Sequence, residues 1–191
     1  NGTDITDWFD YDSGNFWEQA WLEGVDVPDG FALALAGGGF TGNPWAYQSI
    51  GVTDGQPLMT VTFDYGSFAD AGNNRDLGVT WSAYIITGSF TPGQNVDIHN
   101  ALGVTLLDSV MTSSLGVLPG TNAGPTTLTL DVSAAGSNTV YLRVTNFTPT
   151  TTQGDNGYLW VDNVSVAVIP EPSAALLLGA GALVMAKRRK R

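Results

Sequence analysis

Apolar and polar residues alternate along much of this chain with a period of two, and this pattern limits its fold more than any other feature. In the stretch LMTVTFDY, Met59 and every second residue to Tyr65 are apolar or aromatic, whereas the residues between them are polar. The stretches TLTLDVS and TVYLRVT repeat the pattern. No segment before Pro170 shows a long apolar period of about 3.6 residues, the period of a helix. Because successive side chains of a strand point to opposite faces, the pattern predicts strands.

The number and spacing of these strands indicate the fold class. Further candidates bring the expected total to about eight, and they are FALALA, WAYQSIGV, LGVTWSAYII, VTLLDSV and YLWVDNVSVAV. Turn residues such as Asp155-Asn156-Gly157 separate them. Strands with one polar face are typical of antiparallel sheets packed as a sandwich. We therefore expect an all-β jelly roll in residues 1–169, a length that suits one domain.

The charges divide the chain into two unequal parts. All but one of the 18 acidic residues precede Pro170, whereas five of the seven basic residues end the chain as Lys187, Arg188, Arg189, Lys190 and Arg191. A body this acidic disfavours nucleic acid, which needs cations against its phosphates. Neutral glycans, or anionic glycans bridged by divalent cations, are compatible partners. There is no cysteine, so the stability of the domain rests on core packing, on a bound metal, or on both.

The basic end follows an apolar run and a short motif. Pro170-Glu171-Pro172 is followed by the uncharged residues 174–186. A helix of that length rises about 20 Å, against a bilayer core of about 30 Å, so it is short for a span unless Lys187 snorkels or the bilayer thins. The basic residues favour the cytoplasmic side and place the acidic body outside. We expect a separate C-terminal region at 170–191, with a short transmembrane helix.

This ending resembles the PEP-CTERM sorting signal of bacterial surface proteins, in the order and spacing of its three parts. The residue before the motif is usually Val in that family, and here it is Ile169. The resemblance implies an exported protein that is held in the inner membrane as a precursor. An exosortase would then process it near the motif and send it to the cell surface or the extracellular matrix. Since the sequence begins at Asn1, we expect that a secretory signal peptide is missing from its front.

The body is similar to galactose-binding-like jelly rolls of carbohydrate-binding modules. The similarity rests on AYQSIGV, then GQPLMTVTFDYGSF, and a closing GYLWVDNVSV. It implies binding of glycan or exopolysaccharide. The residues themselves favour Trp45 and Tyr47 as ligand-binding side chains, because they share one strand face after a glycine-rich loop and aromatic rings stack on sugars. Core packing is the alternative for both residues.

Calcium is the expected cofactor, in a structural role. If Val164, Val166 and Val168 face the core, strict alternation also turns Asp162 inward, where a carboxylate is costly without a partner. Either a bulge near Asn163 turns it outward, or hydrogen bonds or a metal satisfy it. The carbohydrate-binding resemblance implies calcium at Asp162. Asp10 and Asp12 have the alternate spacing of a calcium loop but lack its closing glutamate, and a solvated acidic turn is the other interpretation.

Catalysis is not expected. His99 is the only histidine, no nucleophile elbow lies near it, and the body has only Glu18 and Glu23 as glutamates. The glutamate and aspartate strand motif of sandwich-fold glucanases is absent. We predict an exported, exosortase-sorted surface protein that binds glycan. The alternative is a structural or adhesive envelope protein with no small ligand.

Overall fold

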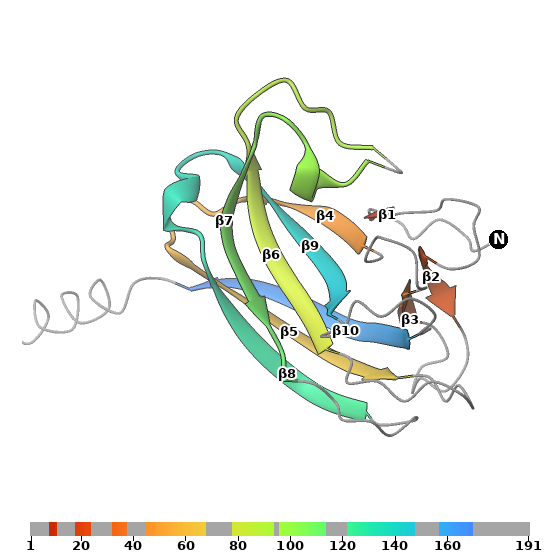
Figure 1. Cartoon of the computed structure of the whole chain (residues 1–191). Helices are drawn as coiled ribbons and strands as arrows, with labels where there is room; N and C mark the ends of the chain where they lie inside the picture. The colour runs from red at the N-terminus through yellow and green to blue at the C-terminus, as the bar shows by residue number, and fades with distance from the viewer. Residues whose placement is uncertain are drawn as a thin grey trace, which may run out of the picture.

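The computed structural model describes residues 8–10, 18–23, 32–37, 45–67, 78–93, 96–113, 122–147 and 157–169. These residues form two five-stranded sheets. The first sheet contains, in spatial order, β1 (Phe9–Asp10), β4 (Trp45–Val52), β9 (Thr139–Phe147), β6 (Gly78–Ile86) and β7 (Val104–Met111). The second contains β2 (Glu18–Glu23), β3 (Ala32–Gly37), β10 (Gly157–Ile169), β5 (Leu58–Ser67) and β8 (Asn122–Asp131). Figure 1 shows the two sheets as facing layers.

The strand pairing is that of a jelly roll. β6 pairs with β7, β5 with β8, β4 with β9 and β3 with β10, all antiparallel, so each pair encloses the previous one along the chain. Alternate pairs belong to alternate sheets. The all-β sandwich and its jelly-roll form are therefore confirmed, and each of the eight expected strands is present. β1 and β2 were not expected, because neither shows a clear alternation.

The main core lies between the sheets and is built from the inward side of the alternating strands. In β5, Met59, Val61 and Phe63 are fully buried, while Thr60 and Thr62 lie on the outer side, as predicted. β8 contributes Leu130 to this core. The remaining large members from the other strands are Leu33, Leu35, Val79, Trp81, Ile85, Val140, Leu142, Val144, Leu159 and Val161.

Strand β10 departs from the strict alternation that the sequence suggested. Leu159 and Val161 lie in the core, but after the next two residues the even-numbered Val164 and Val166 pack against it. The register with β5 shifts between Asp162 and Ser165, and Asn163 has a φ of 52°. A β-bulge thus exchanges the two faces of the strand. Of the alternatives that the sequence left open, the bulge near Asn163 is the one observed, and strict alternation, which would put Asp162 on the side of Val164, does not hold.

Two short 3₁₀ helices complete the described residues, η1 (Ile98–Asn100) and η2 (Ser133–Ala135). None of the described helices has the length and apolar content needed to cross a bilayer. The expected C-terminal hydrophobic helix, the Pro170-Glu171-Pro172 motif and the five basic residues all lie outside the described residues.

Candidate functional site

A second cluster of large side chains lies on the outer side of the first sheet. In β4, Ala46 points into the main core, so Trp45 and Tyr47 point away from it. Their rings lie 5.6 Å apart, and Phe9 on β1 lies 5.1 Å from Tyr47. Tyr84 on β6 belongs to the same cluster. We call this surface the aromatic face, made of Phe9, Trp45, Tyr47, Tyr84, Tyr141 and Arg143.

Register places one cation in the middle of the aromatic face. Phe9 pairs with Tyr47, Tyr47 with Arg143, Arg143 with Ser82, and Ser82 with Ser109, so one row crosses all five strands. The hydroxyl oxygens of Ser82 and Ser109 are 2.8 Å apart. Arg143 therefore has an aromatic ring on one side and hydroxyls on the other.

The described residues of the loop between β6 and β7, 87–93 and 96–103, pack on the aromatic face through Phe90, Gly93 and Ile98. Its two ends are closed by backbone bonds, since the N–H groups of Thr87 and Gly88 donate to the carbonyl of Gly103 at 2.6 and 2.9 Å. Gly88 and Gly103 touch so closely that a Cβ on either would lie 2.7 Å from the other's Cα. Figure 1 shows this loop beyond the ends of β6 and β7, with η1 turned toward β4 and β9.

An ion pair joins this loop to the sheet. Arg143 donates from Nε to Asp97 Oδ1 at 2.8 Å and from Nη2 to Oδ2 at 3.0 Å. The two side chains are 8% and 18% exposed, so the pair is largely shielded from water. Asp97 also accepts the N–H of His99 at 3.0 Å and so caps η1. A forked, charge-assisted pair of this kind holds one defined geometry.

Two tyrosine hydroxyls add polar contacts to the loop. The Tyr47 hydroxyl donates to the carbonyl of Gly93 at 3.0 Å and accepts its N–H at 2.9 Å. The Tyr84 hydroxyl lies 2.6 Å from Nδ1 of His99. Burial raises the pKa of both tyrosines, and for Tyr84 the nearby Arg143 and a hydrogen bond from Ser82 oppose that rise. A raised pKa keeps both phenols protonated at neutral pH, so the Tyr84 hydroxyl has a proton to donate toward Nδ1 of His99.

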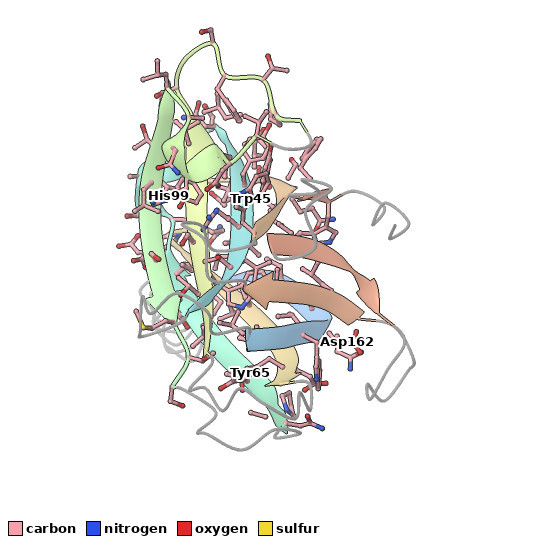
Figure 2. All side chains as sticks on the ribbon, turned by 45° about the vertical axis from the view of Figure 1, so that its right-hand side comes forward. Trp45, Tyr65, His99 and Asp162 are labelled. Atoms are coloured by element: carbon pink, nitrogen blue, oxygen red, sulfur yellow. The ribbon has the colours of Figure 1, made fainter. Side chains whose placement is uncertain are left out.

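Of the two interpretations of Trp45 and Tyr47, the structure shows packed side chains, not exposed rings open to a ligand. Trp45 is 5% exposed and Tyr47 is fully buried, because neighbouring rings and the loop cover them. Their shared strand face was predicted correctly. Figure 2 shows Trp45 and His99 at the same end of the first sheet.

Arg143 and Asp97 were missed as site residues by the sequence reasoning. They are 46 positions apart, and no local motif joins them. The available signal was Arg143 itself, one of only two cations before Lys187, placed at a polar position of an alternating strand.

The described residues contain no arrangement typical of acid–base or metal-dependent catalysis. The His99 ring faces a tyrosine hydroxyl, and the Asp97 carboxylate binds the His99 backbone and not its ring. Within the described ranges, no group of three His, Cys, Asp or Glu side chains is placed to hold a metal. The arrangement suits binding by stacking and hydrogen bonding.

Asp162 lies at the β10 bulge in the second sheet (Figure 2). Its Oδ1 accepts the N–H of Asn163 at 2.7 Å, and its Oδ2 is buried without a hydrogen-bond partner among the described residues. Asp64 pairs with Asp162 across the strands, and Asn163 Nδ2 donates to Asp64 Oδ2 at 2.8 Å. Carboxylate oxygens are ligands that calcium takes, and of the about six to eight oxygens it needs the described acidic residues supply those of Asp162 and Asp64. Asp10 lies on β1 of the other sheet, and Asp12 lies outside the described residues.

The comparisons with known proteins show the fold. No protein-family model matches the chain, and no curated protein matches it. Among solved structures it is similar to the enzymatically active domain of tailspike protein 4 of bacteriophage CBA120, with a TM-score of 0.52 and 13% identity over 87% of this chain. The match covers 20% of the tailspike chain, so this chain spans about a fifth of its length.

Two further structures are carbohydrate-binding proteins. A CBM4 protein has a TM-score of 0.48 and 14% identity, over 85% of this chain and 95% of that one. Carbohydrate-binding modules of the β-sandwich superfamily have a TM-score of 0.44 and 12% identity, over 78% of this chain and 52% of that one. At 13% identity, the likeness to the tailspike domain shows a shared fold alone and leaves function to the site.

Proposed function

We propose that this chain is a non-catalytic module that binds neutral glycan through the aromatic face. The observation that carries the proposal is the set of aromatic rings gathered around the single guanidinium of Arg143, on the outer side of the first sheet. Aromatic faces stack on the apolar faces of sugar rings, and forked donors bind sugar hydroxyls. Such binding needs no surplus of positive charge, which agrees with the acidic body.

The side chains that a ligand can reach lie at the margin of the aromatic face and next to it. Phe9, Phe90 and Tyr141 are only partly buried against the cluster, and His99 and Ser49 are exposed. Ser49 pairs with Tyr141 across β4 and β9, so a hydroxyl and a ring lie side by side there. We place the first sugar contact at Tyr141, where a partly buried ring lies beside the exposed Ser49.

A glycan array probed with residues 1–169 in calcium-containing buffer tests the proposal. Tyr141→Ala should weaken binding of any glycan found by roughly 30-fold, the effect of losing about 2 kcal/mol from an interface anchor. Tyr141→Phe keeps the ring and should retain binding, as should Thr129→Ala on the exposed side of the second sheet. If no glycan binds the unmutated protein, the structural or adhesive alternative is favoured, since it needs no open aromatic surface.

We also propose a location and a cofactor. The Pro170-Glu171-Pro172 motif, the apolar run and the basic end support export with an inner-membrane precursor, processing by an exosortase, and release to the cell surface or extracellular matrix. The orphaned oxygen of Asp162 and the adjoining Asp64 support calcium bound between β5 and β10. Calcium there would have a structural role, because the aromatic face lies on the other sheet.

A further inference from the structure

The described part of the loop between β6 and β7, residues 87–93 and 96–103, covers Trp45, Tyr47 and Tyr84, the buried rings of the proposed binding face. Ile98 of η1 is fully buried in the same cluster as Trp45, Tyr47 and Tyr84. Phe90, also from this loop, packs partly against that cluster. A sugar that stacked on Tyr47 or Tyr84 would have to take the place of these loop side chains.

Three polar contacts from separate strands hold the loop down. Tyr47 of β4 binds the backbone of Gly93, Tyr84 of β6 binds His99, and Arg143 of β9 binds Asp97. Of these contacts, the docking of the loop depends most on Asp97, because its carboxylate binds both the guanidinium of Arg143 and the backbone N–H of His99 in η1. Removing its charge leaves Arg143 shielded from water with a weaker partner, which is costly.

The neck of the loop closes independently of the aromatic face. The bonds from Thr87 and Gly88 to the Gly103 carbonyl, and the contact of the two glycines, involve no residue of β4 or β9. Folded proteins open locally in contiguous cooperative units, and a loop whose ends are joined is one contiguous unit. The neck can therefore stay closed while the contacts of Tyr47, Tyr84 and Arg143 are broken.

We infer that the described residues 87–93 and 96–103 form a releasable strap, latched by Asp97 on Arg143, whose release uncovers the aromatic face. The gating part of this inference rests on the proposed glycan binding; the release itself does not. The sugar would then meet the rings of Tyr47 and Tyr84 and the guanidinium that Asp97 vacates.

Hydrogen exchange of two backbone amides in the full chain tests the release. The Gly93 amide is protected by the Tyr47 hydroxyl, so it reports docking of the strap, whereas the Gly88 amide reports the neck. Asp97→Asn should speed exchange at Gly93 by at least about tenfold and leave Gly88 unchanged. If Gly93 is unaffected, or if both amides accelerate together, the strap is overturned.

Asp131→Asn is the matched control. Asp131 accepts the N–H of Ser133, two residues on, beside η2, just as Asp97 accepts that of His99 beside η1. The described contacts of Asp131 include no arginine, so its substitution should leave Gly93 exchange unchanged.

The unmutated chain supplies a test that does not depend on a variant folding. Gly93 should exchange through an opening that low denaturant does not accelerate, whereas β9 amides should exchange by global unfolding. Exchange of Gly93 only through global unfolding contradicts the strap.

Glycan binding separates the two proposals. With the strap released in Asp97→Asn, a glycan bound by the unmutated protein should bind several-fold more tightly, because less of the binding energy is used to open the face. Unchanged affinity overturns the gating. If Gly93 responds as expected but no glycan binds either protein, the strap stands and the proposed function fails.

Discussion

Trp45 is a packed residue whose surroundings come from three separate parts of the chain. Its ring lies beside Tyr47 on its own strand, and its cluster includes Tyr84 of β6 and Ile98 of the strap. Because only 5% of its surface is exposed, Trp45 contributes to the stability of the domain, and it could contact a ligand only if the side chains over it moved.

Trp45→Ala should therefore destabilise the domain. Truncating a buried Trp typically costs about 3 kcal/mol or more, so the urea midpoint should fall clearly. Trp45→Phe preserves most of the packing and should cost less. A midpoint unchanged by Trp45→Ala, together with lost glycan binding, would instead support the exposed anchor that the sequence suggested.

Tyr47 and Tyr84 should make the domain sensitive to alkali. Burial raises the pKa of each phenol above its ordinary value of about 10. The neutral phenols stabilise the fold fully below that ordinary value, and the contribution is lost as pH rises through the raised folded values. The melting temperature should fall above about pH 10. The tyrosinate absorbance of Tyr47 and Tyr84 should appear at a higher pH than that of a free tyrosine. In Tyr47→Phe the alkaline fall should be shallower, and an unchanged slope would contradict this account.

At the scale of elements, β5 and β10 approach each other closely where Gly66 faces Trp160. A Cβ on Gly66 of β5 would lie 2.5 Å from Cε2 and Cζ2 of Trp160 on β10. The strand can have no side chain there, because the indole occupies the space.

Gly66→Ala should thus cost about 1–3 kcal/mol, the usual penalty of overpacking. Gly93→Ala is the control, since its Cβ would meet no heavy atom within 4 Å. Chemical denaturation of both variants measures the difference. Equal midpoints for Gly66→Ala and the unmutated protein would mean that Trp160 moves aside at little cost.

The bulge between these strands is the place to test calcium. Calcium that binds only the folded protein should add about 2.7 kcal/mol of stability at 100 times its dissociation constant. A chelator should lower the melting temperature of the unmutated protein but not that of Asp162→Asn or Asp64→Asn. Asp54→Asn, in an exposed turn, should behave like the unmutated protein. A melting curve that the chelator leaves unchanged rules out the site.

At the scale of the whole molecule, the acidic body and the basic end are expected to separate. Protein recovered from its host after release should lack the segment that follows Pro170-Glu171-Pro172, because the resemblance of this ending to a sorting signal implies processing there. Mass spectrometry of the released protein measures its C-terminus. Recovery of released protein that still ends in Arg191 would overturn the sorting proposal. Replacing the five basic residues with glutamine should disturb membrane retention and orientation.

Much of the fold was predictable because the alternation of side chains between the two faces of a strand is a local property. The side chains of β5 alternate by covalent geometry alone, so Met59, Val61 and Phe63 could be assigned to the core from the sequence. The same alternation placed Trp45 and Tyr47 on one face. The acidic body, the absence of cysteine and the antiparallel sandwich followed from composition and pattern.

The alternation of side chains does not show which distant segment covers a given face of a sheet. Only the tertiary structure decided that. Trp45 is buried because a loop that begins some forty residues later folds back onto it, and Arg143 meets Asp97 across 46 positions. At the β10 bulge, one left-handed residue, Asn163, exchanges the faces of the strand and sets the position of Asp162. Loop docking and register shifts depend on the summed packing of distant segments, which no local pattern contains.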